Sequence, residues 1–250
     1  GCRKSPHMPI SIVTIALNDV SRIERTIASV LRQPDDLAEY HVVDGGSTDG
    51  TWEVVTSYAG TFTSSTTERD GGIYDAMNKG IKRCSSPLIG IVNAGDFYFP
   101  WTLRAIAEAA QGSDADIFHG DQMVFTTYER FSWFRIQQPN PDINALEAKP
   151  SIFHPTCFVR RSLYERIGYF DTRYRVDADY EFLLRAKRSG AKFQYIPRLL
   201  TGFESGGISG GCTRYSEGYK ILKDYNIPRY TSNTVKLLRC LMMKAIGQVV

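Results

Sequence analysis

Hydrophobic and polar positions follow one another along this chain in blocks that predict strands and helices in turn. A nearly unbroken β-branched run over residues 10–17 predicts a strand buried on both faces. An apolar stripe at helical spacing follows over 23–31, behind Ser21 and Glu24, which have the spacing of a capping box. The chain is therefore expected to open with a strand and then a helix.

The same strand–helix unit recurs further along the chain. Strands are predicted at 40–43, 62–68, 88–92, 116–119, 153–159 and 193–196, and helices at 51–58, 101–110, 161–168 and 178–189. Residues 123–136 alternate as a β-hairpin or edge strands do, and the proline-containing loop 137–150 could move over a site. Short alternating units predict an α/β fold with a doubly wound, mostly parallel, Rossmann-like sheet and a small antiparallel edge.

Three acidic motifs each follow a hydrophobic run, at 42–50, 93–96 and 176–185. Because an open α/β sheet gathers its ligand-contacting side chains at the ends of its strands, the motifs predict one crevice for a nucleotide, a metal and a base. The sequence contains no Gly-x-Gly-x-x-Gly and no P-loop motif, which leaves a dinucleotide-binding Rossmann enzyme and a P-loop kinase with little support.

Single residues of these motifs allow more than one interpretation. Asp44 closes a buried strand ahead of two glycines and suits contact with a base or ribose, whereas Asp49 is better explained as a helix cap. Asp96 could offer a hard oxygen to a divalent ion, or could serve a simple turn. Asp177 and Asp179 begin an apolar-periodic helix; one can serve the helix N-terminus, and the other can take a proton from an acceptor hydroxyl.

With these motifs the chain resembles the GT-A fold glycosyltransferases of family 2, especially the bacterial polysaccharide-assembly members, over about residues 10–209. Segment 14–18 resembles the family's first-strand motif, 43–51 its nucleotide-binding turn, and 68–80 the segment beside the nucleotide. The resemblance implies nucleotide contacts by Asn18, Asp44, Asp70 and Asn78.

The resemblance also implies a metal ligand and a catalytic base. Asp96 corresponds to the ligand of Mg²⁺ or Mn²⁺, although Gly95 stands where the family usually has an acid. Asp179 corresponds to the catalytic base, and Asp177 is the reserve candidate. For His154, a purely structural hydrogen bond is the alternative to a contact with the substrates. Contacts with donor or acceptor are expected at Asn93, Gly95, His154, Glu204, Gly206 and Gly207.

The implied function is that of a metal-dependent inverting glycosyltransferase. It would move a sugar from a nucleotide-diphosphate-sugar donor to a hydroxyl of a saccharide or lipid-linked acceptor in surface polysaccharide assembly. A sugar nucleotidyltransferase, which attacks phosphorus instead of carbon, is one alternative. A non-catalytic binding protein with a degenerate site, suggested by Gly95, is the other.

Composition and charge narrow the partners and the location. Hydrophobic residues make up 42% of the chain and charged residues 23%, and the formal net charge is only +3, too even a balance to favour nucleic acid. Five separate cysteines without a Cys-x-x-Cys pair favour the cytoplasm. We expect a glycosyltransferase domain at 8–230 and a basic amphipathic helix at 231–250, which either contacts an anionic membrane, at the inner face of the cell membrane, or packs on protein.

Overall fold

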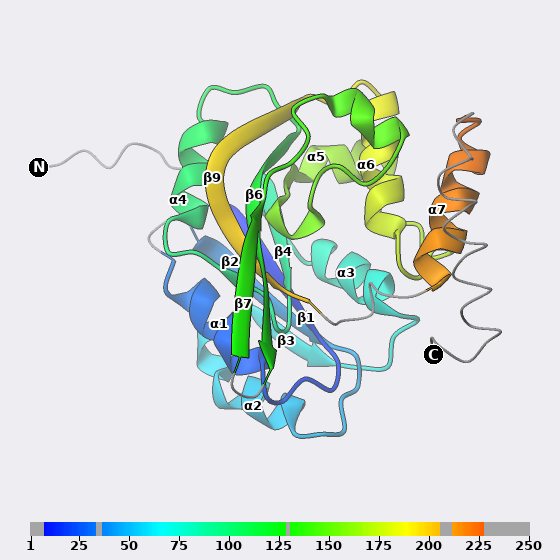
Figure 1. Cartoon of the computed structure of the whole chain (residues 1–250). Coiled ribbons are helices and arrows are strands. Elements are labelled where there is room, and N and C mark those ends of the chain that lie inside the picture. Colours follow the sequence, from blue (N-terminus) through cyan, green and yellow to red (C-terminus); the bar gives the residue numbers. More distant parts are fainter. Residues whose placement is uncertain (1–7, 34–36, 129–130, 206–211, 228–250) are drawn as a thin grey trace, which may run out of the picture.

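The computed structural model describes residues 8–33, 37–128, 131–205 and 212–227, and Figure 1 shows the arrangement of their helices and strands. The strands are β1 (Ile10–Ala16), β2 (Leu37–Asp44), β3 (Ser64–Thr67), β4 (Leu88–Asn93), β5 (Phe97–Tyr98), β6 (Ile117–Tyr128), β7 (Phe131–Gln137), β8 (Phe158–Arg160) and β9 (Phe193–Glu204). The helices are α1 (Ile23–Leu31), α2 (Thr51–Ser57), α3 (Ile73–Ile81), α4 (Thr102–Ala110), α5 (Arg161–Ile167), α6 (Ala178–Arg188) and α7 (Cys212–Asp224), with short 3₁₀ helices η1 (Ala59–Thr61), η2 (Ile143–Glu147) and η3 (His154–Thr156).

The strands of this described part form one mixed sheet in the order β3-β2-β1-β4-β8-β6-β9-β5, with β7 paired to β6. Parallel pairs join β1 to β2 and β4, β2 to β3, and β6 to β9. Strand β8 runs antiparallel between β4 and β6, and β5 and β7 form antiparallel edges. The predicted α/β fold with a parallel sheet and an antiparallel edge is confirmed.

Helices cover both faces of the sheet (Figure 1). Two hydrophobic cores lie between the helices and the sheet. Helices α3, α5, α6 and α7 pack on one face, where β1 contributes Val13 and Ile15. Helices α1, α2 and α4 pack on the other, where β1 contributes Ile10 and Ile12. A strand covered on both sides gains from apolar side chains at every position, which explains the continuous hydrophobic run at the start of the chain.

Several elements differ from the sequence prediction because long-range pairing decides their length. Strand β9 extends to Glu204, where the prediction stopped at 196, because it pairs along β6 through two register shifts near Gly120. Strand β6 continues into the hairpin without a break. The predicted strand at 153–159 is instead η3 followed by the short β8.

The predicted capping box at the start of α1 is wrong. The helix begins at Ile23, and its N-cap residue Arg22 makes no side-chain capping bond. The backbone carbonyl of Asp19 accepts from the N–H groups of Arg22 and Ile23, both at 3.0 Å, and satisfies those two donors.

Across the described residues, no helix combines the length and the apolar character that crossing a bilayer requires. The basic segment predicted at 231–250 lies outside the described residues.

Candidate active site

The carboxyl ends of β1, β2 and β4 lie at one level of the sheet. In the strand register Ala16 is opposite Asp44 on one side, and Ile15 is opposite Asn93 on the other. With neighbouring strands about 4.8 Å apart, Asp44 and Asn93 stand roughly 10 Å from each other across β1. The nucleotide motif and the motif around Asp96 therefore meet at the same sheet edge.

Asp44 and Asn18 hold the loops at this edge. The buried Asp44 carboxylate accepts from the N–H groups of Gly46 and Ser47, at 3.1 and 2.9 Å, and from the Thr67 hydroxyl at 2.6 Å. Asn18, in the left-handed region at φ 50°, accepts from Thr48 N–H through its side chain and donates its own N–H to the Ser47 hydroxyl. A base contact by Asp44 requires one of these internal bonds to be exchanged, and it stays a prediction.

Asp70 lies against the same turn. Its carboxylate accepts from Gly72 N–H at 2.9 Å, and a Cβ added to Gly45 would come within 2.6 Å of Asp70 Oδ2. Only a glycine at position 45 lets the two segments approach so closely. The structure therefore brings together Asn18, Asp44 and Asp70, three of the four residues predicted to contact a nucleotide.

Asn78, the fourth, has a different role in the structure. Its side-chain amide donates to the Phe170 carbonyl at 2.9 Å and accepts from the Phe170 N–H at 3.0 Å. The side chain is nearly buried, so both amide groups are satisfied by the backbone. Asn78 ties α3 to the segment after α5, and its nucleotide contact stays a prediction.

Asp96 lies in a cluster of charges between β4, β9 and α1. Its Oδ1 accepts from the Glu204 backbone N–H at 2.9 Å. The Glu204 carboxylate in turn pairs with Arg25 at 2.5 Å and faces Arg22 at 3.7 Å. Gly95 adopts φ 95°, a conformation that a side chain strains, and its carbonyl accepts from Arg25. Gly95 and Glu204, predicted to contact donor or acceptor, thus lie in this cluster.

Burial sets the protonation of Asp96. The side chain is 4% exposed. Desolvation raises the pKa of its carboxyl to about 7, although the Glu204 N–H and the two nearby arginines favour the charged form. A carboxyl with this pKa becomes fully ionised at neutral pH only when a further positive charge arrives.

Asp179 begins α6 and faces α3. The Tyr74 hydroxyl lies 2.9 Å from Asp179 Oδ1 and 2.6 Å from the Val176 carbonyl, so its single proton is shared between two acceptors. Among the described residues, Oδ2 of Asp179 has no hydrogen-bond partner. Burial and the Asp179 charge raise the pKa of Tyr74 well above its usual value, which keeps the phenol protonated as a donor.

A cavity of about 540 Å³ opens beside Asp179. Its lining includes Asn93, His154, Asp177 and Asp179, four of the residues predicted to act on donor or acceptor. The end of β4 and the start of α6 therefore line the same cavity. Asp44 and Asp96 do not belong to this lining and lie on the neighbouring strand ends and turn.

The His154 ring stands edge-on to Phe170, with 5.4 Å between the ring centroids. Burial lowers the pKa of His154, and the nearby Asp179 charge only partly opposes this shift. The imidazole is therefore neutral at physiological pH and can both donate and accept one hydrogen bond at the cavity wall.

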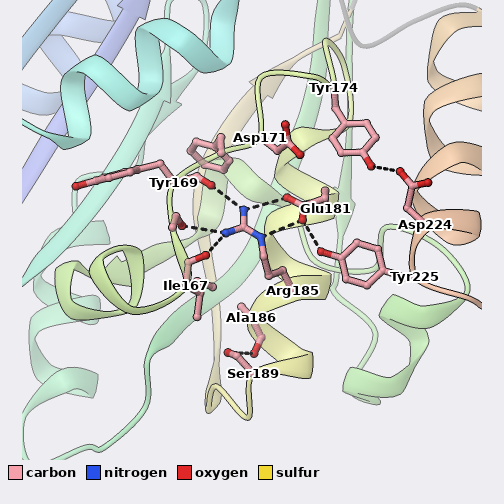
Figure 2. A network of polar contacts seen from close by, with 12 residues as sticks. Ile167, Tyr169, Asp171, Tyr174, Glu181, Arg185, Ala186, Ser189, Asp224 and Tyr225 are labelled. Carbon is pink, nitrogen blue, oxygen red and sulfur yellow. Dashed lines mark hydrogen bonds and ion pairs between the residues drawn. The ribbon is translucent and has the colours of Figure 1, made fainter.

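A polar network fixes α6 and the segment before it (Figure 2). Arg185 pairs with Glu181 at 2.9 and 3.0 Å and donates to the carbonyls of Ile167, Gly168 and Tyr169, which end α5. The hydroxyl of Tyr225, just beyond α7, donates to Glu181.

From α7, the Glu217 carboxylate accepts from the N–H groups of Arg175, Val176 and Asp177, at 2.8, 2.7 and 3.1 Å. Two carboxylates and one guanidinium thus hold the backbone that presents Asp177 and Asp179.

Sequence reasoning missed several residues of this region. Tyr74 stands two positions after a Gly-Gly pair, a signal that the strand-end argument did not use. Gln122, Arg135 and Arg175 line the cavity from segments that had no motif, and only the tertiary structure finds them. Gly206 and Gly207 lie outside the described residues, so their predicted contacts remain predictions.

The family model described as "Glycosyl transferase family 2" matches residues 11–168. The chain belongs to this family. The match covers β1 through α5 and so includes the turn after β2, the Asp96 motif and most of the cavity wall. Membership of glycosyl transferase family 2 makes the chain a glycosyltransferase.

Named relatives of this glycosyltransferase act in glycan biosynthesis. A PGL/p-HBAD biosynthesis glycosyltransferase from Mycobacterium bovis is 31% identical over 206 residues, which cover 80% of this chain and 78% of the relative. The succinoglycan biosynthesis protein ExoU from Rhizobium meliloti is 27% identical over 210 residues, 75% of this chain and 59% of ExoU.

Solved structures share the fold at low sequence identity. Residues 1–349 of TarS from S. aureus superpose with a TM-score of 0.66 at 18% identity, over 86% of this chain and 64% of TarS 1–349. The mannosyltransferase PcManGT from Pyrobaculum calidifontis, solved with GDP-Man and Mn²⁺, superposes with a TM-score of 0.67 at 18% identity, over 98% of this chain and 79% of PcManGT. The family 2 chain has the GT-A fold.

Proposed function

We propose that this chain is an inverting glycosyltransferase that moves one sugar from a nucleotide-diphosphate-sugar donor to a hydroxyl of a saccharide or lipid-linked acceptor. Family membership supports sugar transfer. The roles of the relatives in PGL/p-HBAD and succinoglycan biosynthesis support a place in surface polysaccharide assembly. We place this activity in the cytoplasm, with residues 231–250 as a candidate contact with the inner face of the membrane.

The observation that carries the proposal is the setting of Asp179. Its carboxylate is anchored through Oδ1 to the Tyr74 hydroxyl at 2.9 Å, and it borders the cavity. The second oxygen, which has no partner among the described residues, is available to accept a proton. A general base needs this combination of fixed orientation and a free acceptor atom.

In the proposed step Asp179 Oδ2 takes the proton of the acceptor hydroxyl as the acceptor oxygen attacks the anomeric carbon. The bond between that carbon and the phosphate oxygen breaks on the opposite face, and the nucleoside diphosphate leaves with the electron pair. One displacement inverts the anomeric configuration. Asp177 is the reserve base, because it borders the same cavity two residues earlier.

The donor is a nucleotide sugar in this proposal. TarS has been solved with UDP-GlcNAc and PcManGT with GDP-Man, and both share the fold of this chain. Asn18, Asp44 and Asp70 meet around the turn after β2, and we assign them to the nucleotide. The diphosphate would then extend across the end of β1 toward Asn93 and Asp96.

The residues around Asp96 fit a divalent cation of the kind held mainly by its substrate. Among the described residues no cluster of three or more His, Cys, Asp or Glu side chains could hold a metal, but Mg²⁺ and Mn²⁺ often take only one or two protein carboxylates together with phosphate oxygens. One oxygen of Asp96 is used by Glu204 N–H, and the buried Oδ1 of Asn93 has no hydrogen-bond partner. The other Asp96 oxygen and Asn93 Oδ1 would hold Mg²⁺ or Mn²⁺, which neutralises charge on the departing diphosphate.

A two-stage experiment tests the proposed function. A thermal-shift screen with UDP, GDP, dTDP and CDP sugars and Mn²⁺ identifies the donor, because stabilisation follows occupancy. Asp179→Asn is then expected to bind that donor within about twofold of wild type and to lose about 10²–10⁴-fold in kcat for transfer. Asp177→Asn tests the reserve base and is expected to keep most of the turnover. An Asp179→Asn protein that keeps wild-type turnover contradicts the assignment of the base.

A further inference from the structure

The cavity beside Asp179 contains two arginines for which the proposed transfer step has no role. Arg135 comes from β7, and Arg175 comes from the segment that α7 holds ahead of Asp177. Both side chains are exposed. Within the described residues neither guanidinium forms an ion pair with an acid. A guanidinium that faces a cavity without an acid partner is available to an anionic ligand.

The Arg135 side chain is tied into a polar strip along the β6–β7 hairpin. Once the Gln137 amide is oriented to suit its neighbours, its oxygen accepts from Arg135 Nη2 at 2.9 Å and Nε at 3.3 Å. Gln137 pairs across the hairpin with Gln122, and their side-chain amides lie 2.7 Å apart. Arg135 and Gln137 share one face of β7 because alternate residues of a strand do. The strip Arg135–Gln137–Gln122 thus forms one wall of the cavity.

Two amide groups in the cavity lining have unsatisfied hydrogen-bonding atoms. Gln122 is 6% exposed, and its Oε1 is buried without a partner. If the Gln122 amide is rotated so that its oxygen accepts from the reoriented Gln137 amide, Gln122 Nε2 is left without a partner instead. Asn93 Oδ1 is also buried without a partner. Because an unsatisfied buried polar group costs about 1–3 kcal/mol, the Gln122 amide favours a ligand that supplies hydroxyls, which donate and accept. Asn93 Oδ1 is already assigned to the cation.

This wall comes from strands other than those that carry the expected nucleotide residues. The nucleotide residues lie at the ends of β1 and β2 and beside β3, whereas β7 is reached only after crossing β4, β8 and β6 in the strand order. The remaining lining near the hairpin includes Val124, Ile152 and Phe203, apolar surfaces on which a sugar ring can pack.

We infer that the β6–β7 wall and Arg175 form the acceptor subsite, and that the acceptor is a saccharide with an anionic oxygen group near the hydroxyl that receives the sugar. Arg135 and Arg175 hold the anionic group, and Gln122 bonds a ring hydroxyl. The anion is the carboxylate of an acidic sugar or a phosphate attached to the sugar. The inference deepens the proposed function and rests on it, because it takes the cavity beside Asp179 as the place of transfer.

Binding measurements on the full chain, saturated with the nucleotide that the thermal-shift screen identifies, test this subsite. The probes are methyl glucoside, galactoside and mannoside, the matching methyl uronides, and the matching hexose 6-phosphates. At least one anionic probe is expected to bind about tenfold tighter than its neutral counterpart. If only the uronide binds tighter, the anion is a carboxylate. If only the hexose 6-phosphate binds tighter, the anion is a phosphate. Equal binding of neutral and anionic probes in all three series overturns the inference.

Arg135→Gln and Arg175→Gln are each expected to reduce the preference for the anionic probe by about fivefold or more, and the double variant to abolish it. Arg104→Gln, with the same change in charge but on α4 at the opposite face of the sheet, is the matched control and should keep the preference. A preference that survives in the double variant overturns the inference. The inference is also overturned if the arginine variants weaken binding of the nucleotide as strongly as binding of the probe, since the arginines then bind the donor.

The outcome is separable from that of the proposed function. Probe binding requires no turnover, so Asp179→Asn should keep the anionic preference, or increase it by the loss of a nearby negative charge, while transfer is lost. Loss of the preference with transfer intact defeats only the subsite, and full turnover in Asp179→Asn with the preference intact defeats only the assignment of the base.

Discussion

The hydroxyl of Tyr74 lies 2.9 Å from Oδ1 of Asp179, although 105 positions separate the two residues in the chain. Tyr74 belongs to α3, which follows the nucleotide-side loop at Asp70, and Asp179 belongs to the first turn of α6. The bond therefore connects the region assigned to the donor with the residue assigned to proton transfer. It fixes which carboxylate oxygen remains free for the acceptor.

Tyr74→Phe should reduce kcat about tenfold with little change in donor affinity, because the Asp179 carboxylate loses the bond that orients it. Steady-state kinetics together with a donor titration measure both quantities. Tyr180→Phe is the matched control, since its hydroxyl donates to the Leu146 backbone carbonyl at 2.6 Å. Equal losses of kcat in the two variants would show that Tyr74 acts only through stability.

Removal of the metal should weaken binding of the donor, and this effect should depend on Asp96. In calorimetric titrations with Mn²⁺ we expect wild type to bind the nucleotide sugar about tenfold or more tighter than in EDTA, because the cation screens the diphosphate. Asp96→Ala should bind equally in both conditions, at the level of wild type in EDTA. A variant that keeps the full response to Mn²⁺ would exclude Asp96 as a ligand.

Asp96 should also make stability fall as the pH rises. Its pKa is raised from 3.8 to about 7 in the folded protein by burial, so the folded state holds this proton more tightly than the unfolded chain does. This contribution is complete below about pH 4, declines as the pH rises toward 7, and is absent above that.

Asp96→Asn removes this decline. In urea unfolding with EDTA, its stability relative to wild type should rise between pH 5 and 8 by about 2–4 kcal/mol. The exposed Asp114→Asn is the control: Lys192 lowers the pKa of Asp114, so any effect of that pair falls at more acidic pH. Parallel curves for wild type and Asp96→Asn would contradict the raised pKa.

Arg185 should be required both for stability and for the geometry of the site. Arg185→Ala leaves the buried Glu181 carboxylate, 5% exposed, without its cation and removes the bonds to the end of α5 (Figure 2). We expect a loss of about 3 kcal/mol in the free energy of unfolding, measured with urea.

Arg188→Ala on the same helix, which loses a cation–π contact with Tyr225 and no ion pair within the described residues, should cost less than about 1 kcal/mol. Equal losses in the two variants would show that the network contributes little.

Local signals predicted much of the fold and part of the site. The apolar runs at Ile10–Ala16 and Leu88–Asn93 predicted central strands, which the structure contains. Residues at the carboxyl ends of neighbouring parallel strands lie at one edge of the sheet. Asn18, Asp44 and Asp70 meet there as expected. Asn78 also bonds the Phe170 backbone, 92 positions away, and no local motif encodes that pairing.

The sequence by itself determined the fold class, the order of the first strands and helices and the family, because these follow from short-range periodicity and from motifs whose residues lie next to one another. The tertiary structure alone decided the length of β9, the bond between Tyr74 and Asp179, and the meeting of Arg135 with Arg175 at one cavity. Each of these depends on contacts between distant segments, whose geometry is set by packing and strand register and leaves no local trace in the chain.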